Sequence, residues 1–430
     1  MNFTSTRHRT PETGIEDALA AGLAPDGGLY VPEAIPAADL QAPGGTLAAM
    51  AARVLAPYVA GSRLAPALDA LCAEAYAFDA PLRGLHGDGD FVLELFHGPT
   101  AAFKDYAARF LAGALQRLRD PDAPATTIVV ATSGDTGAAV ASAFHGRDGF
   151  RVEILYPDGK VSPRQAHGLG CWGGNVRAWR VDGSFDDCQR MAKAVLADAA
   201  LRQRVPLTSA NSISLGRLLP QAAYYAQAAA RHQAAHGRPL GFIVPTGNLG
   251  NACACLLAQR MGAPIHGLHL ATNGNDVLPR YLDGGDYAPR DTVATLANAM
   301  DVGAPSNFER LRHWFPDADA LRGAIAATRV DDARIRATIA GAPARHGIVP
   351  CPHTATGLHA LERLRAGGDA RDWAVVATAH PAKFETIVEP LVGHVVEPPP
   401  ALAASLAVPA DSLPLANDDD ALRRVLDAPP

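Results

Sequence analysis

Lys104 is the residue whose surroundings most favour chemistry. It lies in the stretch FHGPTAAFKDYAARF, residues 96–110, at or near a predicted helix start, and residues 101–103 before it are apolar. Burial against apolar groups and the positive end of a helix dipole both lower the pKa of a lysine amine. A neutral amine is what Schiff-base formation and proton transfer require. The alternative interpretation is a surface lysine paired with Asp105.

The segment TGNLGN, residues 246–251, is the best candidate for a phosphate-binding loop. Gly247 and Gly250 let the backbone approach an anion, and a helix is predicted to begin at about Ala252. The free N–H groups and the positive dipole end of that helix would face the phosphate. The spacing is not that of a Rossmann GxGxxG motif, and the Gly-Lys pair at 159–160 lacks the first glycine of a P-loop. The alternative is an ordinary glycine-rich turn.

Two further loops carry polar groups after predicted strands. TSGDTG, residues 132–137, offers hydroxyls, the Asp135 carboxylate and turn N–H groups, which suit a small carboxylate or a ring hydroxyl. Taken alone, a helix-capping turn is the simpler interpretation of that loop. ATAHPAKF, residues 377–384, follows the last predicted strand. Because ligands in open α/β sheets bind at the carboxyl ends of strands, we expect these loops and 246–251 to form one site.

The elements that position these loops alternate along the chain. Strands are predicted at 91–96, 126–132, 151–157, 176–183, 241–247, 265–273 and 373–380. Ala-rich helices are predicted between them, including 137–146, 186–204, 216–237 and 252–262. Such alternation is typical of an α/β fold with parallel sheets. Residues before about 90 are mostly helical in pattern, and the Pro/Ala-rich tail after about 391 is expected to be a wrapping or partly loose segment.

Composition excludes several classes of function. The net charge is −6 and 19% of residues are charged, so no basic surplus indicates nucleic-acid binding. No apolar run approaches the roughly 18 to 20 residues that span a bilayer. The six cysteines show no CxxC pair and no zinc-type spacing, so we expect reduced thiols, a cytoplasmic location and no metal. The chain has only four lysines, Lys104, Lys160, Lys193 and Lys383.

An ordered set of motifs resembles the threonine synthases, a family of fold type II pyridoxal-5′-phosphate (PLP) enzymes. HGPTAAFKD is similar to the family's lysine motif, and ATSGDTGAAVA to its Ser-Gly-Asp-Thr-Gly loop. The other matching segments are GLAPDGGLYVP, ILYPDGKVSPRQ, TSANSISLGRLLPQ, VPTGNLGN, ATNGNDVLPRYL, NAMDVGAPSNFER and ATAHPAKFE. The resemblance covers roughly residues 5 to 390. The chain departs from the family at Leu249, where Phe is frequent, at Ser214, where Asn is common, and at Ala107 and Ala108, where glycines are common.

The resemblance implies a role for each matching residue. Lys104 would be the catalytic lysine that forms the Schiff base with PLP. The backbone of Gly247, Asn248, Leu249 and Gly250 would hold the cofactor phosphate, and Thr378 would bond the pyridine nitrogen. Ser133, Gly134, Asp135 and Thr136 would line the cofactor's ring oxygen and the substrate carboxylate. The substrate-side candidates are Thr100, Lys160, Ser162, Asn211, Ser212 and Arg217, with Lys160 and Arg217 favoured for the substrate phosphate.

The resemblance also implies a fold and a reaction. The fold is type II, with two open parallel-sheet α/β domains, PLP between them and an extra N-terminal helical module. The expected divisions are 1–90 for this module, 91–210 for the smaller domain, 211–392 for the larger domain and 393–430 for the tail. The reaction would convert O-phospho-L-homoserine and water to L-threonine and phosphate. This small molecule is the expected partner, with no nucleic acid and no membrane, and a monomer is favoured.

Two alternatives remain open from the sequence. One is a related PLP-dependent dehydratase or phospholyase acting on a phosphorylated or hydroxy amino acid. Serine/threonine dehydratases and cysteine-synthase-like enzymes usually have Asn where this chain has Asp135, and they lack the segments around 298–301 and 379–384. The other is a non-catalytic relative that binds PLP or a phosphorylated ligand. Loss of the lysine or of the phosphate loop would indicate it, and both are present.

Overall fold

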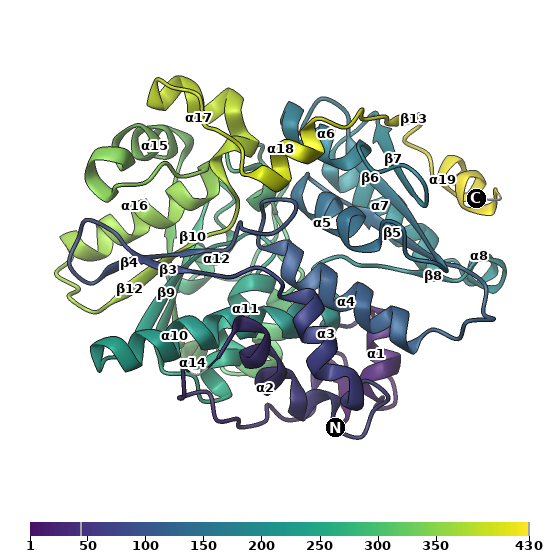
Figure 1. Ribbon diagram of the computed structural model, residues 1–430, viewed down its shortest axis with the longest axis horizontal. Helices are drawn as coiled ribbons and strands as arrows, with labels where there is room; N and C mark the ends of the chain where they lie inside the picture. Colours follow the sequence, from purple (N-terminus) through teal and green to yellow (C-terminus); the bar gives the residue numbers. More distant parts are fainter. Residues whose placement is uncertain (44, 429–430) are drawn as a thin grey trace.

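Most strands of the chain gather into two sheets that lie side by side (Figure 1). The computed structural model describes residues 1–43 and 45–428, so residue 44 of the expected N-terminal module and residues 429–430 of the expected tail lie outside it. The sheets have six and five strands, in the orders β11-β10-β9-β12-β4-β3 and β13-β7-β6-β5-β8. Neighbouring strands are parallel throughout, except for the antiparallel pair β3 and β4. The α/β class predicted from the alternation is confirmed.

The centre of the larger sheet is buried on both faces. Its strands are β3 (Leu82–Gly84), β4 (Asp90–Glu94), β9 (Leu240–Pro245), β10 (Ile265–Thr272), β11 (Ile325–Arg329) and β12 (Trp373–Ala377). Every residue of β9 and β12 is buried, as expected for parallel strands covered by helices on both sides. The helices α10 (Ala222–His236) and α11 (Gly250–Arg260) cover one face, and α15 (Asp332–His346) and α16 (Pro352–Ala366) cover the other.

The smaller sheet follows the same plan. Its strands are β5 (Thr126–Ala131), β6 (Phe150–Pro157), β7 (Val176–Val181), β8 (Leu207–Thr208) and β13 (Leu413–Leu415). The helices α4 (Lys104–Leu118), α5 (Asp135–Phe144) and α6 (Pro163–Gly170) lie on one side, with α7 (Phe185–Ala197) and α8 (Ala199–Arg204) on the other. Four strands of this sheet, β5 to β8, follow the lysine motif in sequence. The helix α4, which begins at Lys104, packs on α5 beside the sheet.

The N-terminal residues form a small helical layer beneath both sheets in Figure 1. It contains α1 (Ile15–Ala21), α2 (Leu47–Val59), the 3-10 turn η1 (Ala65–Ala67) and α3 (Leu68–Ala75). A two-stranded antiparallel ribbon joins β1 (Phe3–Ser5) to β2 (Tyr30–Pro32). α2 packs on α10 and α1 packs on α4, so the layer contacts helices of both sheets.

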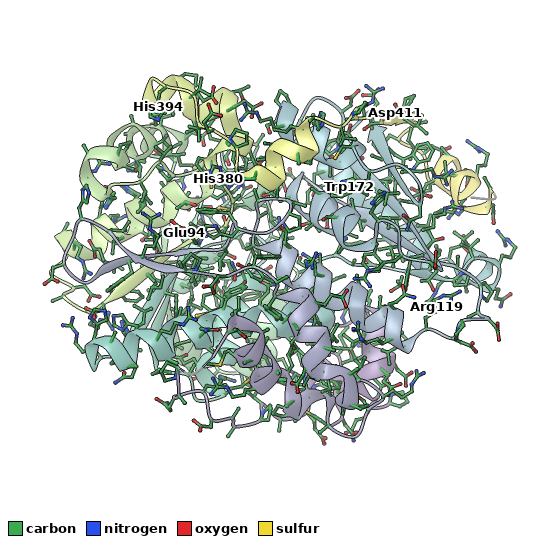
Figure 2. The ribbon with its side chains drawn as sticks, in the orientation of Figure 1. Glu94, Arg119, Trp172, His380, His394 and Asp411 are labelled. Carbon is green, nitrogen blue, oxygen red and sulfur yellow. The ribbon has the colours of Figure 1, made fainter. Side chains whose placement is uncertain are left out.

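The C-terminal segment crosses from the larger sheet to the smaller one. It runs through α17 (Glu385–Val392) and α18 (Pro400–Leu406) to β13, which extends the small sheet beside β7, and ends in α19 (Asp419–Asp427) on α7. The backbone N–H of Asp411, labelled in Figure 2, donates to the Gly170 carbonyl at 3.0 Å. The sequence left open a wrapping or a loose tail, and the described part wraps.

Several element boundaries differ from the sequence expectation. β4 pairs with β12 in the larger sheet, although residues from 91 onward were expected in the smaller domain. The long helix expected at 216–237 is broken around Pro220 into α9 (Leu215–Leu218), the 3-10 turn η2 (Leu219–Gln221) and α10, because proline lacks the N–H that a helix interior needs. The helix expected at 186–204 is split at Asp198, which caps α8 with its side chain. The remaining elements are α12 (Val277–Leu282), η3 (Asn298–Met300), α13 (Phe308–Trp314), α14 (Ala318–Ala324) and η4 (Pro381–Phe384).

No helix in the described part of the chain has the length and apolarity needed to cross a membrane. Within the same residues, no group of three or more His, Cys, Asp or Glu side chains is arranged to hold a metal ion.

Candidate active site

The three polar loops meet at one cleft between the two sheets, as their positions after strands predict. TSGDTG follows β5, TGNLGN follows β9, and the 377–384 loop follows β12. The cleft has a volume of about 1530 Å³. Its lining includes Lys104, Ser133, Asp135, Thr136, Gly247, Asn248, Leu249, Gly250, Asn211, Ser212, Arg217 and Thr378.

Lys104 is the first residue of α4, and its side chain is partly buried. Its Nζ lies 5.4 Å from the centre of the Phe103 ring, and no hydrogen bond or ion pair involves it among residues 1–43 and 45–428. Burial lowers the pKa of Lys104 to about 8, the nearby charge of Asp135 opposes this, and Arg217 and Lys383 add to it. The cleft thus holds an amine that is free of partners and close to half neutral just above physiological pH.

The backbone before Lys104 is fixed by the loop after β12. The Phe103 N–H donates to the Thr378 carbonyl at 2.9 Å, and the His380 N–H donates to the Ala101 carbonyl at 3.0 Å. Ala101 has a φ of 53°, a left-handed conformation that non-glycine residues rarely adopt. Since Ala101 is completely buried and hydrogen-bonded on both sides, its surroundings impose this conformation and set the direction of Lys104.

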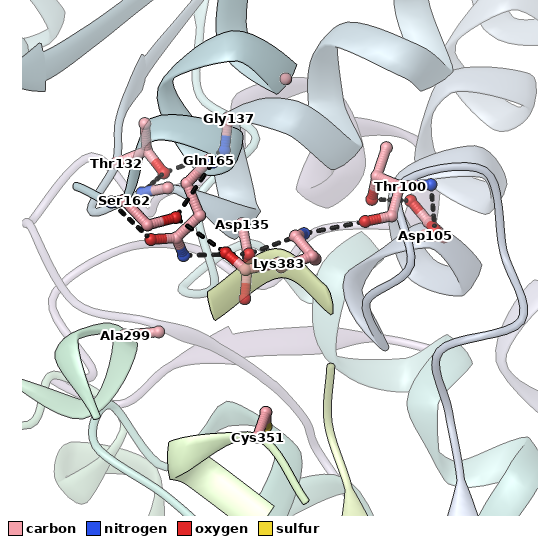
Figure 3. Close-up of polar contacts among 12 residues, drawn as sticks. Thr100, Asp105, Thr132, Asp135, Gly137, Ser162, Gln165, Ala299, Cys351 and Lys383 are labelled. Carbon is pink, nitrogen blue, oxygen red and sulfur yellow. Dashed lines mark hydrogen bonds and ion pairs between the residues drawn. The ribbon is translucent and has the colours of Figure 1, made fainter. Parts of the chain in front are cut away.

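The TSGDTG loop is a tight turn that presents Asp135 at the start of α5. The Thr132 hydroxyl oxygen accepts the N–H groups of Gly134 and Gly137, both at 3.0 Å (Figure 3). Gly134 has a φ of 131°, and an added Cβ would come within 2.6 Å of the Gln165 side chain, so only glycine fits there. Burial raises the pKa of the Asp135 carboxyl, but the charges of Lys383, Lys104 and His353 outweigh burial and hold it well below its usual range.

The TGNLGN loop turns its backbone toward the cleft at the N-terminus of α11. Leu249 caps the helix in the left-handed conformation, with a φ of 65° and no side-chain cap. Asn248 fastens the loop, because its amide donates to the Ser212 hydroxyl at 2.7 Å and its Oδ1 accepts the Ser306 N–H at 2.5 Å. The helix begins at Gly250, two residues earlier than the sequence indicated, so the N–H of Gly250 belongs to its first turn and those of residues 247–249 directly precede it. Such a helix start is a ready site for a phosphate.

Among the expected substrate-side residues, Asn211, Ser212 and Arg217 lie together in the cleft. Arg217 is 1% exposed and donates from Nη1 to the Ala210 carbonyl at 2.6 Å. Its Nε and the Asn211 Oδ1 are buried without a partner in the described residues. Burial lowers the pKa of Arg217 to about 10, which still leaves the guanidinium charged near neutral pH. An anionic ligand in the cleft would satisfy the guanidinium donors.

Thr100, Lys160, Ser162 and Gly134 are not among the residues that line this cleft. Thr100 faces Asp105 instead, donating its hydroxyl at 2.6 Å and its N–H at 2.9 Å to that buried carboxyl group. Lys160 is exposed, and Ser162 caps α6 in a capping box with Gln165. Gly134 shapes the turn behind Asp135. The sequence grouped these residues with the site because its motifs are continuous, but neighbours in a loop can point to opposite sides.

Two residues of the site were missed from the sequence. His353 lines the cleft at the start of α16, and its Nε2 accepts the Ala299 N–H at 3.1 Å. Lys383 is 2% exposed and donates to Asp135 from behind the cleft, at 2.7 Å. Two sequence signals were available for them. Pro352 marks a helix start beside His353, and Lys383 lies in the same motif as Thr378.

The sequence matches three family models. The model described as "Pyridoxal-phosphate dependent enzyme" matches residues 82–382. Those described as "Threonine synthase N terminus" and "Threonine synthase, C-terminal" match residues 2–76 and 354–425. Together they extend over nearly all of the chain.

Curated and solved proteins give the same result. The chain is 37% identical to the threonine synthase of Haemophilus influenzae and 36% identical to that of Escherichia coli, covering 99% of both chains in each case. The crystal structure of the Escherichia coli threonine synthase matches with a TM-score of 0.92 at 35% identity, over 99% of both chains. A PLP-bound threonine synthase from Brucella melitensis matches with a TM-score of 0.89 at 36% identity, also over 99% of both. A PLP-dependent aspartate racemase, at 13% identity and a TM-score of 0.54 over 72% of this chain and 92% of its own, shares the fold alone.

Proposed function

Since the chain belongs to the threonine synthase family, we propose that its cleft converts O-phospho-L-homoserine and water to L-threonine and phosphate, with Lys104 as the catalytic residue. PLP is the cofactor of the enzyme. The observation that carries the residue assignment is the partner-free amine of Lys104 in a cleft that also holds a glycine-loop helix start and a buried guanidinium.

The residues present fit PLP in three respects. Lys104 supplies an amine for the aldehyde, and the N–H groups of the 247–250 loop supply donors for the phosphate. Thr378 supplies a neutral hydroxyl for the pyridine nitrogen. The orphaned Nε of Arg217 and Oδ1 of Asn211 remain for the substrate. When bound, PLP withdraws electrons from the amino acid and so stabilises negative charge on its carbon atoms.

Lys104 has the proton affinity that repeated proton transfer needs. With a pKa of about 8, its Nζ is able to take a proton from the substrate Cα and return it near neutral pH without a large energy penalty at either step. The hydrogen bonds at Ala101 and Phe103 hold the start of α4, so the amine stays directed at the cleft. His353 is also in the cleft, but burial lowers its pKa to about 4, so it remains neutral and is suited to orienting rather than to acid catalysis.

The substrate side is assigned to Asn211, Ser212 and Arg217. The Arg217 guanidinium is the cation for the leaving phosphate, because a buried charge that is not fully paired binds an anion strongly. Asn211 and Ser212 add polar groups beside it, and Ser133 and Thr136 offer hydroxyls for the substrate carboxylate. Lys160 and Ser162 are left out of this assignment because they do not line the cleft.

We also propose that the enzyme acts in the cytoplasm, as a monomer and without nucleic acid. All six cysteines are free and buried, as in a reducing compartment. The exposed large hydrophobic residues of the described chain are few (Met1, Val293, Val395, Val408 and Leu413), which favours a monomer. Light scattering of the purified enzyme tests the monomer, which a mass of twice the 44.8 kDa chain would contradict.

The reaction is tested by incubating the PLP-loaded enzyme with O-phospho-L-homoserine. We expect threonine and inorganic phosphate to form in equal amounts, and Lys104→Ala to form neither. Phosphate with 2-oxobutyrate in place of threonine would instead identify a phospholyase or dehydratase. A PLP-loaded enzyme that converts no substrate would support the non-catalytic alternative.

A further inference from the structure

A second lysine lies directly behind the site. The Nζ of Lys383 donates to Asp135 Oδ1 at 2.7 Å and to the Thr100 carbonyl at 2.8 Å (Figure 3). Its own carbonyl accepts the Ser162 hydroxyl at 2.8 Å. One buried side chain thus joins the loop after β12, the loop after β5 and the turn before Lys104.

Lys383 is the middle link of a continuous polar chain. Gln165 donates to Asp135 at 3.3 Å, Lys383 joins Asp135 to the Thr100 carbonyl, and Thr100 in turn donates to Asp105, the residue that follows Lys104. Asp135 is itself 3% exposed and Asp105 is completely buried. Every link is protected from water, so charges along this chain act over short distances with little screening.

Asp135 has two ammonium groups within electrostatic reach, and only one of them binds it. Lys383 forms the ion pair at 2.7 Å, whereas no ion pair joins Lys104 to Asp135 in the described chain. The charges that act on Lys104 are those of Asp135, Arg217 and Lys383, and those that act on Asp135 are Lys383 and Lys104, joined by His353 only when it is protonated. Asp105 and His380 also face Lys383. Among the charges that act on Lys104, that of Asp135 alone favours its charged form.

We propose that Lys383 is a positioning residue that occupies the Asp135 carboxylate and thereby keeps the Lys104 amine free of an ion pair. This inference deepens the proposed function, on which it rests, by naming the residue that maintains the catalytic amine. Without Lys383, Lys104 is the remaining ammonium group that acts on the Asp135 carboxylate. The uncompensated carboxylate then stabilises the charged form of Lys104. Lys383 itself does not line the cleft and touches no reacting atom.

The test measures the titration of Lys104 in the full-length chain after PLP has been removed. Trace acetic anhydride is added at a series of pH values, and the acetylation of each lysine is measured by mass spectrometry. The chain has only four lysines, and the exposed Lys160 and Lys193 serve as internal references in every sample. In Lys383→Met we expect the Lys104 midpoint to rise by about one pH unit or more, which lowers its neutral fraction about tenfold near pH 7.

Lys383→Gln separates charge from hydrogen bonding and serves if the Met variant does not fold, because it keeps a donor near Asp135. It should raise the midpoint in the same direction. Removal of Lys383 in an Asp135→Asn background should raise the Lys104 midpoint by a smaller amount than it does with Asp135 present, since the carboxylate through which Lys383 acts is gone. Lys193→Met, the matched loss of an exposed lysine, should leave it unchanged.

A Lys104 midpoint at or below the wild-type value in folded Lys383→Gln would overturn the proposal. A rise of the same size with and without the Asp135→Asn substitution would overturn the route through the carboxylate. The labelling reads the Lys104 amine alone, so a wild-type enzyme that forms no threonine would refute the proposed function and leave this result intact.

Discussion

The burial of Lys104 should be visible in the stability of the cofactor-free chain. Its pKa is about 8 in the folded protein against 10.5 ordinarily, so between these values the unfolded chain binds more protons and stability rises with pH. Below pH 8 the full cost of burying the charged Lys104 amine is present, and it lowers the free energy of unfolding by roughly 3 kcal/mol at most. Lys104→Met should therefore raise the free energy of unfolding at pH 7, and its advantage should vanish as pH approaches 10.5. Urea titrations measure this, and Lys193→Met, which removes an exposed lysine, should show no such trend.

The buried ion pair between Asp135 and Lys383 should be sensitive to neutralising the Asp135 carboxylate. Asp135→Asn leaves the Lys383 ammonium buried without its counter-charge, because the two side chains are only 4% and 3% exposed. Breaking such a pair costs about 3 kcal/mol or more of folding stability. Asp420→Asn, which breaks an exposed pair with Arg423, should cost less than about 1 kcal/mol. Equal losses in the two variants would contradict the electrostatic account of this site.

At the scale of elements, the loop between β9 and α11 depends on a close approach of two backbones. A Cβ at Gly247 would lie 2.7 Å from both the Cα and the carbonyl oxygen of Met300, neither of which is able to swing away. Gly247→Ala should displace the loop and weaken PLP binding about tenfold or more, as overpacking costs about 1–3 kcal/mol. PLP titration measures the affinity. Gly323→Ala, at an exposed helix position with nothing within 4 Å, should bind PLP as the wild type does.

The elements themselves were predictable where a local pattern decides them. β5, β9 and β12 are short apolar runs followed by polar loops, two of them rich in glycine, and these features are visible in sequence. The place of β4 in the larger sheet was not predictable, because its pairing with β12 joins segments that lie far apart in sequence and no local pattern indicates it. Ser162 and Thr100 bond to local partners, Gln165 three residues on and Asp105 five residues on, and a motif alone does not distinguish such a contact from one with substrate.

At the scale of the whole molecule, the C-terminal segment stabilises the smaller sheet. Leu422 in α19 is fully buried in a cluster with Val129 and Met191, residues from β5 and α7. Leu422→Ala should lower the free energy of unfolding by about 2–5 kcal/mol. Leu413→Ala on the same segment, where the residue is 41% exposed, should cost well under half of that. A Leu422→Ala protein as stable as Leu413→Ala would show that the segment does not support the sheet.

The central claim, that Lys104 is the lysine that holds PLP, is tested most directly by trapping it. The PLP-loaded enzyme is reduced with borohydride and digested, and the peptides carrying the pyridoxyl group are identified by mass spectrometry. With only four lysines in the chain, the answer is unambiguous. We predict that the group is found on Lys104, in the peptide containing HGPTAAFK. Its presence on Lys383, Lys160 or Lys193 instead would contradict the assignment of Lys104 as the cofactor lysine.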